Sequence, residues 1–421
     1  MTRILVAGGG VAGVAAAVSA SKRGADVVLA EGSGGLAPNK SLFPLLLSGG
    51  VTQAELRVAD PEDLRARFGI EVRLGDQVSS IHASSGLARI RGGRVGFDRA
   101  IIATGSRAVL DNVRGVSKKG VFTLRALEDY LALSESLGGL SSIAISGPIP
   151  LSLILAQALS RVARVSVFVG GWTLQWFTQR VLGAVSESAS SMGARLLFQP
   201  VDAIVGVDRV EAVVSSGEVH PCDGAVILPR SLPCLPSVDC VKGDHGGAVV
   251  DDSMRTTSPI VFAAGDCAEL RCGLGSFPSR LHSSSLSMGE VAGVNAAGGA
   301  ARASISRCLA LDLFGVEVCV AGLDADGARR AGLDAVEFDA LGENGEPDTS
   351  LVYDKVTLRL YGVQLAGRGA LGLSDYISLA VASGTSLGDL AYQESPFLPS
   401  FNRDKSPISL TASRALTRAR G

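Results

Sequence analysis

Apolar residues in this chain come in short runs that end at glycine-rich turns and are followed by segments of helical length. Such runs predict buried parallel strands at 3–7, 26–30, 142–146 and 164–169, with further buried strands within 99–107 and 257–268. An alanine-rich run at 14–20 predicts a helix directly after the first strand. Strands that alternate with helices in this way indicate an α/β fold built on parallel sheets.

The pattern changes at about residue 309. Residues 311–322 and 351–367 alternate like antiparallel strands, whereas 375–383 and 387–390 have a helical pattern. The chain has 421 residues, which is too many for one hydrophobic core. We therefore expect one or two α/β domains, followed in sequence by an α+β domain at the C-terminal end.

The first strand leads into a G-x-G-x-x-G turn, Gly8-Gly9-Gly10-Val11-Ala12-Gly13. Gly8 allows a tight turn, Gly10 lets a pyrophosphate approach the backbone, and Gly13 lets the helix pack closely on the strand. The N-terminus of the helix offers N–H groups to the phosphates. Glu31 ends the next strand, where a carboxylate would bind an adenosine ribose.

Two later segments narrow the prediction from a dinucleotide to FAD. A buried strand ends at Ala103-Thr104-Gly105, and another ends at Ala264-Gly265-Asp266-Cys267. In this order and spacing, the fingerprint and these two motifs resemble the FAD domain of the pyridine nucleotide-disulfide oxidoreductases. The resemblance covers nearly the whole chain, and its FAD motifs are its strongest part.

The resemblance implies two Rossmann-like dinucleotide-binding domains and an α+β C-terminal interface domain. The FAD domain would be discontinuous, at 1–114 and 242–308, with an NAD(P)H-binding-like domain at 115–241 and a dimerisation domain at 309–421. In this family Asp266 would bond the ribityl chain of FAD. The implied FAD contacts also include Gly8, Gly10, Val11, Ala12, Gly13, Glu31, Lys40, Val78, Ala103, Thr104, Gly105, Gly265 and Ser285.

The motif of the central domain departs from the family pattern. Its turn reads Gly147-Pro148-Ile149-Pro150-Leu151-Ser152, so only the first glycine remains. Ile149 stands where pyrophosphate must approach the backbone, and the next strand ends in glycine without an acid for a ribose. A later family glycine is replaced within 228–231. Either this domain binds NAD(P)H in an unusual way, or it keeps the fold without the ligand.

The family's redox cysteine beside the flavin is missing. Counting back from Pro44 places Ser41 at its position, and no cysteine precedes Cys222. A serine hydroxyl cannot form a mixed disulfide, so a cysteine relay is not expected. Relatives without the cysteine use a nearby cation, and Lys40 is the candidate; a solvated lysine at a helix start is the alternative.

The closing segment Ala391 to Phe397, followed by 404–408, resembles the interface segment of the coenzyme A disulfide reductase and NADH oxidase branch. The resemblance implies a homodimer in which Tyr392 reaches the partner's active site, and ordinary interface packing is the alternative for this side chain.

Composition excludes several other classes of function. A net charge of −2 without a basic patch gives no footprint for nucleic acid, and the scattered histidines suggest no metal site. The longest uncharged stretch, at 143–160, is divided by glycine and proline, so no transmembrane segment is expected. Seven cysteines, an odd number, favour free thiols in a reducing cytoplasm.

These observations predict an FAD-dependent oxidoreductase that passes electrons through the flavin without a cysteine relay. NAD(P)H is a possible donor, and the acceptor is a small molecule or an electron carrier. An FAD-binding regulatory or structural subunit without turnover is the alternative.

Overall fold

The computed structural model describes residues 1–110, 113–170, 176–272, 275–278, 280–342, 345–396 and 405–420. The chain forms two compact units, each made of two separate segments of the sequence. Unit 1 comprises Met1–Val109 and Ser231–Ile305, and unit 2 comprises Leu110–Arg230 and Ser306–Gly421. The three-domain division expected from the sequence stays a prediction.

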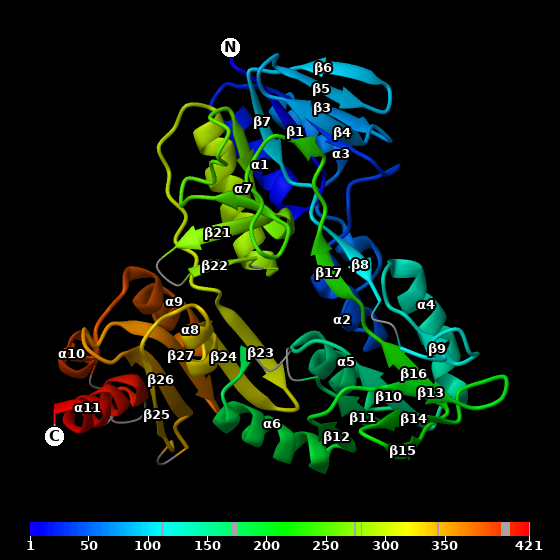
Figure 1. Cartoon of the computed structure of the whole chain (residues 1–421), viewed down its shortest axis with the longest axis vertical. Helices are drawn as coiled ribbons and strands as arrows, with labels where there is room; N and C mark the ends of the chain where they lie inside the picture. The colour runs from blue at the N-terminus through cyan, green and yellow to red at the C-terminus, as the bar shows by residue number, and fades with distance from the viewer. Residues whose placement is uncertain are drawn as a thin grey trace. The chain divides into compact units, whose positions relative to one another are not determined.

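A parallel five-stranded sheet forms the centre of unit 1 (Figure 1). Its order is β20 (Val261–Ala263), β7 (Arg99–Ile102), β1 (Arg3–Ala7), β2 (Asp26–Glu31) and β3 (Glu71–Leu74). Strands β1, β7 and β20 are almost wholly apolar and buried, as expected for a sheet that is covered on both faces. The expected strands and fold class are confirmed here.

Helices α1 (Val11–Ser21) and α7 (His282–Ala296) pack against each other beside this sheet (Figure 1). They approach closely because α7 has glycines where the two backbones meet. A Cβ on Gly289 would lie 2.3 Å from the carbonyl oxygen of Ala12, and one on Gly293 would lie 2.2 Å from that of Ala16. Any larger residue would force the helices apart.

The remaining elements of unit 1 are smaller. The short helices are α2 (Phe43–Leu47), α3 (Pro61–Phe68) and the 3-10 turns η1 (Lys40–Leu42), η2 (Ala54–Leu56) and η5 (Gly265–Cys267). One further sheet has the order β18 (Ser237–Val238), β4 (Val78–His82), β5 (Leu87–Ile90) and β6 (Gly93–Gly96). Another has the order β19 (Ala248–Val250), β21 (Ala268–Cys272) and β22 (Gly275–Phe277), and β8 (Ser106–Val109) pairs with β17 (Arg230–Pro233).

Unit 2 contains a second parallel five-stranded sheet. Its order is β12 (Ala194–Leu197), β11 (Arg164–Phe168), β10 (Ser142–Ser146), β16 (Gly224–Ile227) and β9 (Val121–Phe122). The accompanying helices are α4 (Leu127–Ser136), α5 (Leu151–Leu159) and α6 (Gln179–Ser191), with the 3-10 turn η3 (Leu137–Gly139). A small antiparallel sheet is made of β13 (Ala203–Val205), β14 (Ala212–Ser215) and β15 (Glu218–Pro221). Two Rossmann-like sheets are therefore present, as expected.

The C-terminal part of unit 2 is an antiparallel sheet with helices. The strand order is β23 (Leu309–Leu313), β24 (Val316–Gly322), β27 (Leu360–Ala366), β26 (Asp348–Asp354) and β25 (Ala335–Ala340). The helices are α8 (Ala325–Arg330), α9 (Ser374–Ser383), α10 (Leu387–Tyr392) and α11 (Pro407–Arg420), with the 3-10 turn η6 (Leu371–Leu373). This confirms the expected α+β character.

Buried polar groups join this sheet to the central part of unit 2. The Thr178 N–H donates to Gln364 Oε1 at 2.8 Å, and Gln364 Nε2 donates to the carbonyl oxygen of Trp176 at 3.3 Å. Gln364 is only 1% exposed, so each of these bonds forms away from water, where an unpaired partner would be costly. They link segments far apart in sequence within one compact unit.

Candidate functional site

The turn between β1 and α1 depends on glycines whose places no other residue could take. Gly8 has φ +108°, and a Cβ there would lie 2.3 Å from the Ala103 carbonyl oxygen. A Cβ on Gly13 would lie 1.9 Å from the carbonyl oxygen of Gly8. By contrast, the nearest atom to a Cβ on Gly10 is 3.9 Å away. Gly10 is also partly exposed, so a phosphate can reach its backbone.

Glu31 lies at the end of β2 beside this turn. Its Oε2 accepts a hydrogen bond from the Gly9 N–H at 2.7 Å, and its Oε1 accepts from Ser33 N and Oγ at 2.9 and 2.7 Å. A carboxylate has about four acceptor positions, so acceptor capacity remains for a ribose. Val78 begins β4 nearby, because the N–H of Asp76 donates to the Glu31 carbonyl oxygen at 2.9 Å.

Ala103, Thr104 and Gly105 follow the carboxyl end of β7, next to the carboxyl end of β1. Ala103 N–H donates to the Ala7 carbonyl oxygen at 2.8 Å, and Gly105 has φ +66°. Cys234 is hydrogen-bonded to this segment. The Cys234 N–H donates to the Gly105 carbonyl oxygen at 2.9 Å, and Thr104 Oγ1 donates to the Cys234 carbonyl oxygen. Sequence reasoning missed this neighbour, since nothing local links residues so far apart.

Gly265 and Asp266 form a turn after β20 that meets both α1 and α7. Gly265 has φ +77°, and a Cβ there would lie 2.9 Å from the Ala12 Cβ and 3.5 Å from Ser285 Oγ. Asp266 Oδ2 accepts a hydrogen bond from Ser106 Oγ at 2.9 Å. The structure thus brings Ala12, Asp266 and Ser285 together at the carboxyl end of the sheet, where α/β folds bind ligands.

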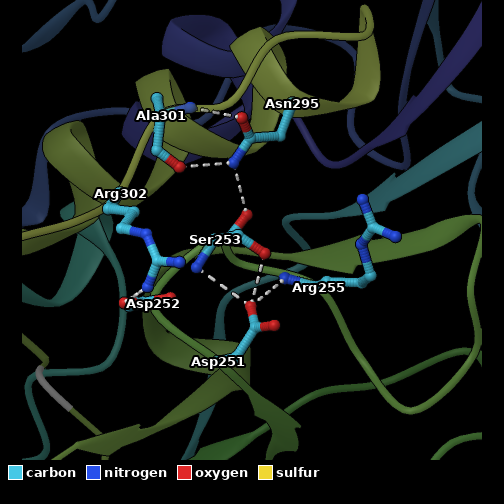
Figure 2. Close-up of polar contacts among 7 residues, drawn as sticks. All are labelled: Asp251, Asp252, Ser253, Arg255, Asn295, Ala301 and Arg302. Carbon is cyan, nitrogen blue, oxygen red and sulfur yellow. Dashed lines mark hydrogen bonds and ion pairs between the residues drawn. The ribbon is translucent and has the colours of Figure 1, made fainter.

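A polar clamp fixes the far end of α7 (Figure 2). Asn295 Nδ2 donates to the carbonyl oxygens of Ser253 and Ala301, both at 2.8 Å, and Asn295 Oδ1 accepts from the Ala301 N–H at 2.7 Å. Asp251 Oδ1 in turn accepts from the N–H groups of Ser253 and Arg255 at 2.9 and 3.0 Å. Asn295 is 3% exposed, so its hydrogen bonds form away from water. They hold the C-terminal end of α7, the helix whose first turn carries Ser285.

Lys40 and Ser41 lie on the exposed turn η1, just before α2. Asn39 Oδ1 accepts a bond from the Ser41 N–H at 3.2 Å and starts this turn. The preceding segment is held against the fingerprint loop, because the Ala37 N–H donates to the Gly9 carbonyl oxygen at 3.1 Å. The two residues therefore follow shortly after a segment that is bonded to the nucleotide loop, and both are accessible to solvent.

The described cysteines differ in how available their thiols are. Cys267 directly follows Asp266, but it is 0% exposed and donates to the carbonyl oxygens of Ile102 and Ala264, both at 3.4 Å. Burial raises the pKa of its thiol to about 11, which disfavours the reactive thiolate. Cys234, beside Gly105, is half-buried.

The corresponding turn of unit 2 is built differently. A Cβ on Gly147 would lie 2.4 Å from the Leu228 Cβ, so the leucine side chain covers this glycine. Ile149, which matches Gly10 in position, is 2% exposed, so its backbone is closed to a ligand. Pro148 and Pro150 have no N–H to offer to a phosphate.

The helix start in unit 2 also carries an orphaned hydroxyl. Ser152 is fully buried at the position of Gly13, and among the described residues its Oγ has no hydrogen-bond partner. Strand β11 ends at Phe168 and is followed by the buried Val169 and Gly170, so no carboxylate stands where Glu31 stands in unit 1. Gly171 lies outside the described residues.

The comparisons with known proteins agree with this geometry. Residues 2–301 match the family model described as pyridine nucleotide-disulphide oxidoreductase. The chain belongs to this family. An NAD(P)H coenzyme A polysulfide/persulfide reductase of Pyrococcus horikoshii is 26% identical, over 97% of each chain. An NADH oxidase of Streptococcus pyogenes is 24% identical, over 75% of this chain and 76% of that one.

Solved structures show the same fold. An NAD-dependent persulfide reductase from A. fulgidus superposes with a TM-score of 0.89 at 22% identity, covering all of this chain and 84% of that chain. Membership of the pyridine nucleotide-disulphide oxidoreductases confirms the predicted family, the oxidoreductase class and FAD as the cofactor.

The residues of unit 1 fit FAD. The loop at Gly10 is open, Glu31 has spare acceptor capacity, and Asp266 and Ser285 lie together near the N-terminus of α7. These are the groups that a dinucleotide with a ribityl chain requires. The assignment of each residue to a particular FAD atom stays a prediction.

The residues of unit 2 do not fit a nicotinamide dinucleotide bound through the usual pyrophosphate and ribose contacts. The covered Gly147, the closed Ile149 and the missing carboxylate remove the groups that hold these parts of the ligand. The fold of the pyridine nucleotide domain is present, but its fingerprint loop is occupied by the protein's own side chains.

Tyr392 ends α10 and is 72% exposed, which is high for an aromatic side chain. Lys405 Nζ lies 5.8 Å from the centre of its ring and donates to the Ala391 carbonyl oxygen at 2.8 Å. Phe397 and residue 404 of the closing motif lie outside the described residues. The homodimer stays a prediction.

Among the described residues, no helix is long and apolar enough to cross a bilayer, and no group of three or more metal-ligating side chains could hold an ion.

Proposed function

We propose that this protein is an FAD-dependent oxidoreductase in which electrons pass from the flavin to the acceptor without a cysteine relay. Bound flavin supplies hydride acceptance and one- or two-electron donation. The protein's own residues supply its position, its electrostatic environment and the access route for the acceptor.

The main support for this proposal comes from the residues of the η1 turn. It presents Lys40 and Ser41, both exposed, at the position where the family pattern places a redox cysteine. A serine at this position cannot form a thiolate, and the described thiol nearest in sequence to Asp266 is the buried Cys267 with its raised pKa. No described thiol therefore combines the family position with the reactivity that a relay needs.

Lys40 then has a role of its own in the proposal. A positive charge near the flavin ring favours anionic forms of the cofactor and so raises its reduction potential. Because Lys40 is exposed, the effect would be screened by salt. The first turn of α7, with Ser285, would add N–H groups and the positive end of a helix dipole.

Family membership makes NAD(P)H the expected donor, and the geometry of unit 2 predicts that it binds weakly. Pyrophosphate contacts at Ile149 and ribose contacts after β11 are both lost, and every ~1.4 kcal/mol lowers affinity tenfold. For the same reason, little preference between NADH and NADPH is expected, since the described residues that follow β11, Val169 and Gly170, have no charged side chain to contact the 2′ position of the ribose.

The acceptor in this proposal is a small molecule or an electron carrier. Relatives are named NADH oxidase and coenzyme A polysulfide/persulfide reductase, so oxygen and sulfur compounds are the first acceptors to test. Direct transfer without a thiol favours oxygen, a quinone or a one-electron carrier over a disulfide.

Anaerobic mixing of the FAD-loaded protein with NADH and with NADPH tests the proposal. Flavin absorbance should decrease, and the rate of this decrease should keep rising up to high nucleotide concentrations. Readmission of an acceptor should restore the flavin absorbance. Dithionite serves as the control, because it reduces flavin without a binding site. Bleaching by dithionite but by neither nucleotide at any concentration would favour a regulatory or structural subunit instead.

A further inference from the structure

Two cysteines of the C-terminal sheet lie together, away from the dinucleotide sites. Strands β23 and β24 are antiparallel neighbours, with Ala310 opposite Cys319 and Leu309 opposite Val320 (Figure 1). Cys308 immediately precedes β23. It is therefore diagonal to Cys319 across the strand pair and on the same face of the sheet.

The backbone before Cys308 departs from regular strand geometry. Arg307 has φ +56°, in the left-handed region, and the Gly322 N–H donates to the Ser306 carbonyl oxygen at 2.6 Å. This irregularity ends the regular ladder at Leu309. Cys308 thus lies at the junction between this irregular segment and the regular ladder.

The register places the two thiols on one face of the strand pair, and they differ in accessibility. The neighbouring Cys319 lowers the pKa of Cys308, whereas the neighbouring Cys308 and burial raise the pKa of Cys319. Cys308 is half-buried and its thiol also faces the Ser374 carbonyl oxygen at 3.7 Å; Cys319 is 0% exposed. An accessible, more acidic thiol beside a buried second thiol is the arrangement found in redox-sensing pairs.

We propose that Cys308 and Cys319 form a reversible disulfide when the protein meets a peroxide. Cys308 thiolate attacks one peroxide oxygen, the O–O bond breaks, and a sulfenic acid and hydroxide form. The thiol of Cys319 then displaces water from that sulfenic acid, which completes the S–S bond. With hydrogen peroxide, two thiols and one peroxide thus give one disulfide and two waters, and a reducing thiol reverses the change.

The position of the pair gives the disulfide a structural consequence. Cys308 follows Ser306, the residue at which the chain enters its second segment of unit 2. A bond to Cys319 would fix this entry segment to the central part of the sheet. Oxidation is therefore expected to stiffen residues 306–309 without altering the FAD site.

Peptide mapping tests the proposal on the full-length protein. Trypsin cleaves after Arg307 and Arg329, so both cysteines lie in one peptide, and a second protease that cuts after Glu317 separates them. After peroxide treatment and alkylation, this peptide should be about 2 Da lighter than the dithiol form and unalkylated. Cutting after Glu317 should leave the two halves linked until a reductant is added.

Cysteine variants test whether these two thiols, and not others, form the disulfide. Cys308→Ser and Cys319→Ala should each abolish the 2 Da loss, whereas Cys240→Ser, at another half-buried thiol, should leave it unchanged. Complete alkylation of both cysteines after peroxide exposure would overturn the proposal. So would accumulation of sulfinic acid on Cys308 with Cys319 still free, and both readouts come from wild-type protein, so they stand even where a variant fails to fold.

Discussion

Leu228 covers Gly147: a Cβ on the glycine would lie 2.4 Å from the leucine Cβ. In the first Rossmann-like fold, the matching Gly8 is held against the backbone of Ala103, while the loop beyond it stays open at Gly10. The two folds share the spatial order of four parallel strands and differ at the loop, which is where a dinucleotide's phosphates are held.

This difference leads to a prediction about nicotinamide binding. The variant Pro148→Gly/Ile149→Gly/Pro150→Val/Ser152→Gly reproduces the residue types of Gly9, Gly10, Val11 and Gly13. It should bind NADH at least ~10-fold more tightly, about 1.4 kcal/mol, because N–H donors and access to the backbone are restored. Stopped-flow rates of flavin bleaching against NADH concentration give the affinity.

The control for this variant is Ile154→Ala, a change on the same helix outside the turn. It should leave NADH affinity unchanged. Wild-type protein that saturates at low micromolar NADH would show that unit 2 binds the nucleotide by contacts that the turn does not describe.

The clamp around Asn295 predicts a large loss of stability. Asn295→Ala leaves two carbonyl oxygens and one N–H without their partner in a buried region, which should lower the free energy of unfolding by about 3 kcal/mol. Arg302→Ala is the matched control in the same cluster, since its ion pair with Asp252 is exposed and worth at most about 1 kcal/mol.

Urea unfolding of both variants, with FAD content measured in parallel, checks this prediction. Asn295→Ala should also retain less FAD, because α7 carries Ser285 toward the Gly265–Asp266 turn. Equal stability of the two variants would mean that α7 is held mainly by its packing on α1.

The flavin's reduction potential should depend on Lys40. Lys40→Met should lower it by about 30 mV, which for two electrons equals about 1.4 kcal/mol. The shift should shrink as salt is added, because Lys40 is exposed. Lys22 lies at the C-terminal end of α1, away from the fingerprint loop, so Lys22→Met should leave the potential unchanged. A shift of equal size in this variant would show that only the net charge of the protein matters.

Dimerisation is expected through the C-terminal part of the chain. Tyr392→Asp should weaken it at least ~10-fold, because a charge would replace an exposed aromatic side chain. Val207→Asp, at a similarly exposed apolar position in the central part, is the control. Sedimentation velocity over a concentration series distinguishes the outcomes, and a wild-type monomer at all concentrations would refute the homodimer.

Much of the fold could be predicted because its signals are local. Strand Ser142–Ser146 was expected at the bounds it has, and the expected helix at 14–20 lies within α1, since apolar runs and glycine turns mark both. The segment 228–231, where a family glycine is expected to be replaced, contains the Leu228 that covers Gly147. Cys234 beside Gly105, Asn295 beside Ser253 and Cys308 beside Cys319 could not be predicted, because each pairing depends on how distant segments cross.

A single spectroscopic titration tests whether the flavin transfers electrons without a neighbouring thiol. The FAD-loaded wild-type protein, pre-reduced with a thiol and freed of it, is titrated anaerobically with dithionite while its visible absorbance is recorded. We predict loss of the flavin band near ~450 nm with no long-wavelength charge-transfer band at any stage. A charge-transfer band that disappears in Cys234→Ser would contradict it, because a thiolate would then lie against the flavin.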